Sequence, residues 1–373
     1  MRLSIVLFKF SVIGLIITSA LFAGCKDEVA PESGIPVIYA PINERVNPDS
    51  LPLRSKLFQK IDTVRLKTDV LEGCINTIKD VKVTDDYIFV LTSDDERLLV
   101  YDMEGTFIRQ IGRKGRGRGE YISAQGFDIL PEKDEIYLCS QLADDINIYS
   151  FSGEFKRNIS PHFLSLEFAV KSDGHLLFFS EYGNTQKGYD RGVFETDADG
   201  NFIKMIFTLP QDYGHIQNND LFTHISDDEI GCMGFEDEDY IYHIKGDSVY
   251  KAYKIKTDIQ MDNETLKHQQ HSSDYAYHKI IYHETDRLLT VSLIGNGKVA
   301  RIYYDKPDHA TYRSVDGSDV KAPKEEDFMP ITSSYKGKWV RVHDVLNIRM
   351  VPELREAFPD ITAESNPVIL IFQ

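Results

Sequence analysis

An internal repeat is the feature that most constrains the fold of this 373-residue chain. Residues 86–112 read as an apolar strand, an acidic turn, a second strand, a glycine turn and a third strand, and residues 134–159 repeat this order. Aligning the units places Gly105 on Gly153, and Gly200 and Gly246 follow at equivalent positions. These glycines are 46 to 48 residues apart, and periods of about 40 to 50 residues are typical of β-propeller blades.

A single blade cannot bury both of its faces, so the blades are expected to close into a ring. The repeat therefore predicts an all-β fold, a six-bladed β-propeller, with five blades as the nearest alternative. A fifth unit carries Asp308 near the turn position, and the sixth is inferred mostly from the remaining length. The strand-like residues 61–67 are expected to close the ring by pairing with residues 368–372. An insertion is predicted near residues 258–273.

The first 24 residues have the pattern of a secretory signal peptide, with Arg2 and Lys9 before an apolar run. The run is about 15 residues long, whereas a spanning helix needs about 20. It ends in LFAGC, which resembles a bacterial lipobox, so Cys25 is the expected lipid attachment site. We therefore predict a signal peptide over 1–24, a flexible tether over 25–54 and one propeller domain over 55–373.

Lipidation of Cys25 predicts an outer-membrane lipoprotein of the cell envelope, anchored to the bilayer without crossing it. The triplet Lys26-Asp27-Glu28 resembles the export signal of surface-exposed lipoproteins of Bacteroidetes, and the alternative is the start of a solvated linker. The periplasmic and the surface-exposed face both stay open.

The net charge of −17 argues against nucleic acid as a partner, because such binding requires a basic face. Besides Cys25 the chain has only three cysteines, which do not suggest a disulfide framework. Cys139 and Cys232 lie inside strand-like runs and are expected to be small buried residues.

The repeat region, above all residues 65–121, and the terminal strand from Asn366 to Leu370 resemble the six-bladed β-propeller lipoproteins of Bacteroidetes, which are related in pattern to NHL-repeat propellers. The resemblance covers nearly the whole mature chain. It implies a cell-envelope protein and brings no catalytic motif that can be transferred to residues of this sequence.

The segment IGRKGRGRGEY, residues 111–121, is the clearest local anomaly in an acidic chain. It lacks the Gly-Lys-Ser/Thr ending of a phosphate-binding loop and lies between two blades. One interpretation is a structural link between blades, and the other is a ligand-contacting loop. A carboxylated or sulfated glycan, or an acidic face of a partner, would suit its side chains. The candidate ligand-binding residues are Arg113, Lys114, Arg116, Arg118 and Tyr121.

Other motifs favour structural interpretations. A histidine group, His268, His271, His278 and His283, has no further ligand at a recognised offset, so solvated or core histidines are expected rather than zinc ligands. The segment from Asp197 to Asn201 is more typical of a hairpin turn than of a calcium loop. The carboxylates of Glu236 to Asp239 are expected in a solvated turn.

The absence of a catalytic motif favours a non-enzymatic binding or scaffold module for a glycan, a peptide or an envelope protein. The alternative is a lyase or hydrolase with a site at the central channel. No organic cofactor and no metal are expected.

Overall fold

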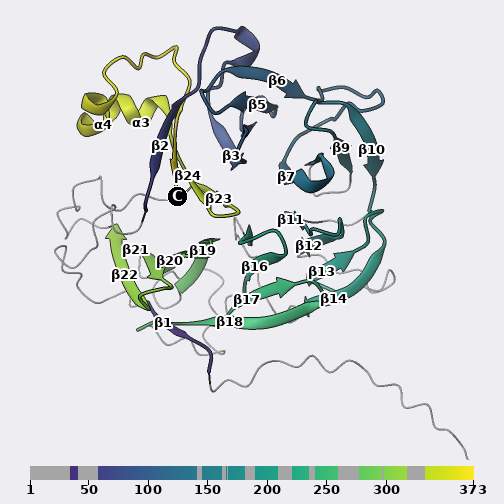
Figure 1. Cartoon of the computed structure of the whole chain (residues 1–373), viewed down its shortest axis with the longest axis vertical. Coiled ribbons are helices and arrows are strands. Elements are labelled where there is room, and N and C mark those ends of the chain that lie inside the picture. The colour runs from purple at the N-terminus through teal and green to yellow at the C-terminus, as the bar shows by residue number, and fades with distance from the viewer. Residues whose placement is uncertain are drawn as a thin grey trace, which may run out of the picture.

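The computed structural model describes residues 34–40, 58–140, 145–161, 165, 167–180, 190–208, 221–234, 240–258, 277–295, 298–316 and 332–373. These residues form an all-β ring with the first strand of each four-stranded unit nearest the centre (Figure 1). The predicted signal peptide, Cys25 and residues 259–273 of the predicted insertion lie outside the described residues. None of the helices in this described part of the chain has the length and hydropathy of a membrane-spanning segment.

Four blades are separate four-stranded sheets in the described chain. The first consists of β3 (Ile78–Val83), β4 (Tyr87–Thr92), β5 (Leu98–Asp102) and β6 (Phe107–Ile111). The second consists of β7 (Gly126–Leu130), β8 (Glu135–Cys139), β9 (Ile146–Tyr149) and β10 (Phe155–Ile159). The third consists of β11 (Glu167–Val170), β12 (Leu176–Ser180), β13 (Gly192–Thr196) and β14 (Phe202–Thr208). The fourth consists of β19 (Tyr277–Glu284), β20 (Leu288–Gly295), β21 (Lys298–Asp305) and β22 (Ala310–Asp316).

The other described strands form one nine-stranded sheet, in the order β1-β18-β17-β16-β15-β23-β24-β25-β2. Its strands are β1 (Val37–Tyr39), β2 (Ile61–Arg65), β15 (Phe222–His224), β16 (Glu229–Met233), β17 (Tyr240–Lys245), β18 (Ser248–Lys256), β23 (Ser333–Tyr335), β24 (Lys338–His343) and β25 (Val368–Phe372). Four short helices complete the described elements: η2 (Leu71–Gly73), η3 (Pro131–Lys133), α3 (Val345–Met350) and α4 (Pro352–Ala357).

The prediction of six blades, and the alternative of five, is wrong. Four separate blades stand in the ring, and the large sheet takes up the remaining strands. The physical reason is a direct pairing between two inner strands. β23 runs parallel to β15, with His224 opposite Tyr335, and this contact joins strands that the repeat assigns to different blades.

The near-continuous apolar runs arise because both faces of a strand pack against neighbours, as the sequence predicts. In β4, Phe89 and Leu91 belong to the core shared with the second blade, whereas Ile88 and Val90 belong to the core shared with the closing strands. All four side chains are fully buried. Alternate residues of one strand therefore stabilise two different interfaces of the ring.

The repeated turn needs a left-handed backbone position. Gly105 has φ +77°, and a Cβ there would collide with the backbone of Arg65. Both the backbone conformation and the lack of space therefore require glycine. The fifth repeat has no glycine at this place. His309, with φ +51°, takes the left-handed position there, one residue after the predicted Asp308.

The ring closes as the terminal segments predict, because β25 lies between β24 and β2 in an antiparallel arrangement. A second N-terminal element was not predicted. Val37–Tyr39, inside the segment assigned to the tether, forms β1 and pairs in parallel with the outer strand β18. The boundaries of the three predicted segments otherwise remain predictions.

A buried charged network joins β17 to the end of β19. The Nδ1 of His243 lies 2.7 Å from Glu229 Oε1, and its Nε2 lies 3.1 Å from Glu284 Oε2. Burial opposes the charge of this imidazole, but the two carboxylates outweigh it and raise the pKa of His243. Burial likewise opposes the charge of Glu284, while His243 and Lys306 outweigh it and lower the pKa of that carboxyl.

This network predicts a stability maximum at mildly acidic pH. The contribution of His243 is complete below its unfolded pKa of 6.5 and is lost as the pH rises through the raised folded value. The contribution of Glu284 is complete above its unfolded pKa of 4.5 and is lost as the pH falls through the lowered folded value. Urea unfolding from about pH 3 to 9 should show both limbs. Equal alkaline slopes for the native chain and a His243→Gln variant would contradict the assignment.

Candidate functional site

A polar cavity occupies the centre of the ring. It has a volume of about 430 Å³ and is lined by side chains from the inner strands β3, β7, β11, β15, β19 and β23. This volume falls within the range of small-ligand pockets, about 300 to 1,000 Å³. The lining includes Lys79 and Lys82 of β3, Asp128 of β7, His224 of β15 and His283 of β19. Because the inner strands meet only at the centre, the fold gathers residues that are far apart in the sequence.

A carboxylate and an imidazole form a buried pair in the wall of this cavity. Asp128 Oδ2 lies 2.8 Å from His224 Nε2 and accepts a 2.7 Å hydrogen bond from the Val170 N–H. Its other oxygen lies 4.0 Å from the Lys82 ammonium. Burial alone would raise the pKa of Asp128, but His224, Lys82 and the Val170 N–H outweigh it and hold that pKa below its usual value. Asp128 is therefore an ionised group that fixes the His224 ring.

The strand β23 brings hydroxyl groups and a tyrosine beside this pair. Ser334 Oγ lies 2.7 Å from Thr223 Oγ1 and 3.4 Å from His283 Nδ1. The Tyr335 ring lies 5.1 Å from the His224 ring, and its hydroxyl donates to the Ile129 carbonyl oxygen at 3.1 Å. The pairing that joins the large sheet thus also positions residues of the site.

A chain of polar contacts connects the cavity with the basic segment. The Lys79 ammonium donates a 2.8 Å hydrogen bond to Gln125 Oε1, and both residues line the cavity. The Gln125 amide donates to Glu96, whose other carboxylate oxygen lies 2.8 Å from Lys114 Nζ. The basic segment therefore lies beside the cavity on the side where Lys79 is exposed.

The structure separates the five predicted ligand-binding residues into different environments. Tyr121 is buried in the core between the first two blades, and its hydroxyl accepts from Gln110 at 3.4 Å. Arg113 and Lys114 are exposed but form ion pairs with Glu120 and Glu96. Arg116 is exposed, and the exposed Arg118 lies over the Phe155 ring at 5.8 Å. Their role in ligand binding stays a prediction.

Internal bonds hold the backbone of the basic segment in place. Glu120 accepts from the Gly117 N–H at 2.7 Å and from Arg113 Nε at 2.7 Å, and these two bonds lower the pKa of its carboxyl. The carboxylate therefore fixes the turn that presents the basic side chains. This arrangement serves the structural link between blades and leaves the guanidinium groups of Arg116 and Arg118 exposed.

Of His268, His271, His278 and His283, the structure describes the side chain of His283 alone, which lines the cavity. His268 and His271 lie outside the described residues, as do the side chain of His278 and the carboxylates of Glu236 to Asp239. The turn after Asp197 is a hairpin turn, in which Asp197 Oδ1 accepts from the backbone of Asp199 and Asn201. Burial raises the pKa of the Cys139 thiol to about 12, which agrees with an unreactive core residue.

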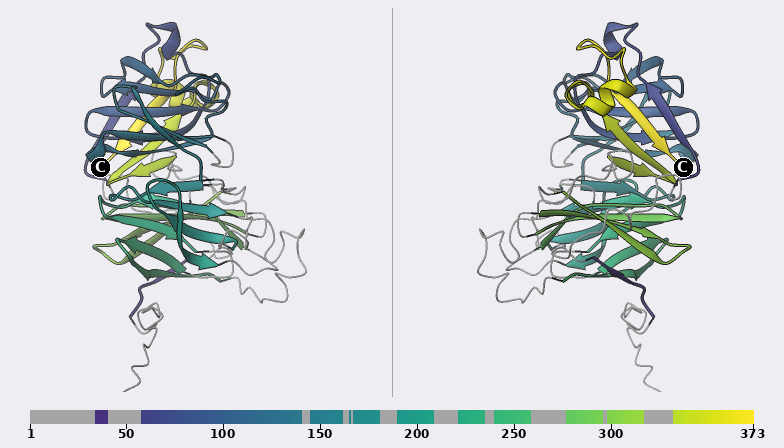
Figure 2. Two further views of the ribbon diagram at one scale, coloured as in Figure 1. Left: turned by 90° about the vertical axis from the view of Figure 1, so that its right-hand side faces the viewer. Right: turned by 90° about the vertical axis from the view of Figure 1, so that its left-hand side faces the viewer.

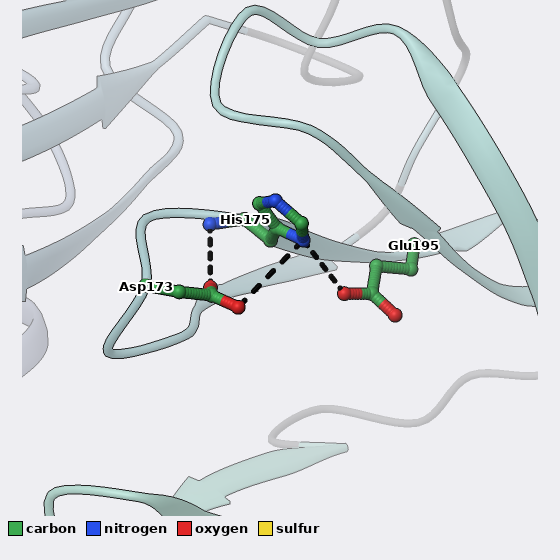
Figure 3. Close-up of side chains that lie close together, drawn as sticks. All are labelled: Asp173, His175 and Glu195. Atoms are coloured by element: carbon green, nitrogen blue, oxygen red, sulfur yellow. Dashed lines mark hydrogen bonds and ion pairs between the residues drawn. The ribbon is translucent and has the colours of Figure 1, made fainter. Parts of the chain in front are cut away.

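A different carboxylate and histidine group, Asp173, His175 and Glu195, has ligand atoms within 4.8 Å of one another (Figure 3). His175 Nδ1 lies 3.0 Å from Glu195 Oε1 and 3.7 Å from Asp173 Oδ2. The Lys171 ammonium, however, lies 2.5 Å from the same Glu195 oxygen. A cation already neutralises this group, so a metal ion would have to displace a buried lysine.

The sequence does not reveal the site residues Asp128 and His224, because Asp128 is a single polar residue in β7 and His224 ends a strand of only three residues. A signal was present, since Asp128 interrupts the otherwise apolar run GFDIL and a buried strand rarely carries an unpaired charge. The sequence could not show that the partner of Asp128 lies 96 residues away.

No curated protein matches this chain in sequence. A crystal structure of a Bacteroides fragilis protein that is thought to be exported superposes with a TM-score of 0.72 and 17% identity, over 91% of this chain and 99% of that chain. A DUF4221 family member from Bacteroides vulgatus superposes with a TM-score of 0.52 and 10% identity, over 87% and 98%. Both support the propeller fold alone. The family described as "Domain of unknown function (DUF4934)" matches residues 39–373, and the chain belongs to that family.

Proposed function

We propose that this chain is an outer-membrane lipoprotein of the cell envelope whose central cavity binds an anionic glycan. The observation that carries the proposal is the connection of Lys79 in the cavity, through Gln125 and Glu96, to the exposed basic segment. These cations lie together in a chain with a net charge of −17.

Two observations support the proposed location in the cell envelope. The N-terminal signal pattern ends at Cys25, where a diacylglycerol would be attached. The Bacteroides fragilis protein of similar fold is itself thought to be exported. A likeness to NHL-repeat propellers would agree with a loop-borne binding site, because propellers present functional groups on loops at one face.

The cavity suits a small polar ligand better than a protein surface. Its volume of about 430 Å³ would hold one or two sugar units, and its lining offers hydroxyl, amide, carboxylate and imidazole groups. Sugar hydroxyls donate and accept hydrogen bonds, so they can use both kinds of partner. A carboxylate or sulfate on the sugar would be placed by Lys79 and by the exposed arginines of the basic segment.

A glycan array with the mature chain is expected to give hits that carry carboxylate or sulfate groups. Replacing Lys79 by alanine should weaken binding at least about tenfold, since a hydrogen bond to a charged group contributes about 1.5 to 3 kcal/mol. The triple change of Arg113, Arg116 and Arg118 to alanine should weaken it at least as much.

The matched control is Lys60→Ala. Lys60 is an exposed lysine next to β2, which lies on the side of the first blade away from the basic segment. Unchanged binding in both the Lys79 and the arginine variants would overturn the proposal. Loss in the arginine variant alone would place the ligand outside the cavity. Cleavage of the bound glycan, abolished by His224→Ala, would favour the alternative of a lyase or hydrolase, which the Asp128 and His224 pair supports.

A further inference from the structure

A basic edge lies on the rim of the ring, where β1 adds to the outer strand β18. Val37 pairs with Lys254 and Tyr39 with Lys256, so their side chains point to the same face of the sheet. Tyr240 of β17 pairs with Lys254 and shares that face. We define the basic edge as Val37, Tyr39, Lys251, Lys254 and Lys256, with Tyr240 beneath them.

A bulge in β18 adds the third lysine to this face. The register between β17 and β18 shifts after Ile241, so that Lys251 lies opposite Tyr242 instead of Ala252. The ammonium groups of Lys251 and Lys254 consequently lie 3.8 and 5.1 Å from the centroid of the Tyr240 ring. Without the bulge, alternation along the strand would place Lys251 on the opposite face.

The basic edge combines cations with exposed apolar surface. Val37 is 55% exposed and Tyr39 is 44% exposed, whereas Ile38 between them is fully buried in the core. A groove of about 300 Å³ runs along the edge and is lined by Ile35, Val37, Tyr240, Lys254 and Lys256, none of which is acidic. Tyrosine rings and lysine stems with charged tips are the side chains suited to the boundary between lipid and water.

The chain that follows the proposed lipid attachment site, Cys25, first joins the ring at this same edge, because β1 is the first described strand. Eleven residues separate Cys25 from Val37, which span at most about 40 Å when fully extended. A domain of this size is about 50 Å across. The rim opposite β1 therefore cannot rest on the bilayer that holds the anchor. Figures 1 and 2 show β1 on the rim, away from both openings of the ring.

We infer that the basic edge rests on anionic lipid headgroups, so that the ring stands on its rim and the central cavity opens parallel to the membrane. This inference rests on the proposed lipidation of Cys25. The lysines attract the headgroup phosphates, while Val37 and Tyr39 contact the boundary of the acyl chains. An acidic protein thus meets an anionic surface with a local cationic face, and its cavity stays open to a soluble ligand.

The test uses the full acylated chain in vesicles of phosphatidylcholine with and without phosphatidylglycerol. A fluorophore is attached to Tyr39→Cys or, as a reference, to Leu71→Cys, in a Cys74→Ser background because Cys139 and Cys232 are buried. Leu71 is 83% exposed and belongs to η2, which contacts β6, and Figure 1 shows β6 on the rim far from β1. Nitroxide lipids should quench the label at 39 several-fold more strongly than the label at 71.

Charge reversal separates electrostatic docking from simple tethering. In the double variant Lys254→Glu and Lys256→Glu, quenching of the label at position 39 should fall at least about fivefold in phosphatidylglycerol vesicles. Each lysine contributes to the attraction by the anionic surface. The matched control, Lys60→Glu and Lys67→Glu, changes two exposed lysines next to β2 and should leave the quenching unchanged.

Equal quenching at 39 and 71 in protein that floats with the vesicles would overturn the inference and leave the lipoprotein proposal intact. Strong quenching at 39 that survives the charge reversal would overturn the role of the lysines. If the full chain, expressed with its signal peptide, carries no acyl groups and does not float with the vesicles, both this inference and the lipoprotein proposal are overturned. Mass spectrometry of the N-terminal peptide distinguishes this last outcome.

Discussion

Replacing Glu284 by alanine is expected to lower the free energy of unfolding by about 3 to 5 kcal/mol, the cost of breaking a buried ion pair from one side. Glu284 is fully buried, shares hydrogen bonds with His243 and the Tyr282 hydroxyl, and forms an ion pair with Lys306. Without this carboxylate, the buried His243 imidazolium and the largely buried Lys306 ammonium have less negative charge near them. The effect should be measured as a lower midpoint in urea with an unchanged slope, because the exposed surface on unfolding stays the same.

Two variants test whether charge is the cause. Glu284→Gln keeps the shape and part of the hydrogen bonding, so its loss should be smaller than that of the alanine variant. Glu104→Ala removes an exposed carboxylate in the turn before β6 and should change stability by less than about 0.5 kcal/mol. If Glu284→Ala is as mild as Glu104→Ala, the network does not hold β17 to β19.

The sequence predicts those parts of the fold that local patterns encode. The apolar runs predict the strands because each strand of a blade packs on both faces, as the opposite environments of Phe89 and Val90 show. The turn glycines predict the period because a left-handed position recurs, as at Gly105. The closing pair is predicted because a strand-like segment, residues 61–67, precedes the first complete repeat and a last strand follows the final one, so the two can share a blade.

The sheet organisation could not be predicted in the same way. β23 has only three residues, SSY, and the contact of Tyr335 with His224 joins residues 111 positions apart without any local pattern. β1 is equally short, and its residues VIY stand in a proline-containing segment whose composition is typical of a linker. Both strands exist because an already folded edge offers them backbone partners, so tertiary context decides their structure.

The candidate site follows the same division. The basic segment could be found because its residues are neighbours in the sequence. The cavity could not, because each inner strand contributes only one to three polar residues, and only ring closure brings Lys82, Asp128 and His224 together. A polar residue in the first strand of each repeat is the signal that would have found them, since those strands surround the axis.

Deleting residues 368–373 is expected to abolish cooperative folding. All five residues of β25 are buried, with Ile369 and Ile371 in the core of the first blade and Phe372 packed 4.9 Å from the Phe58 ring. Five buried apolar side chains at about 1.5 to 3 kcal/mol each contribute about as much as the whole stability of a typical domain. The deletion also removes the only partner that β2 has among the described strands.

Near-ultraviolet circular dichroism of the single Trp339, which is buried beside β25, should report the loss of packing. The Ile371→Ala variant should be intermediate between the native and the truncated chain, with a free energy of unfolding lower than the native value by about 2 to 5 kcal/mol. Removal of the exposed Gln373 alone should leave the transition in place, because it takes away only terminal backbone hydrogen bonds with Gln59 and Lys60. A truncated chain that still unfolds in one transition with the native urea slope would show that the ring does not depend on β25 for closure.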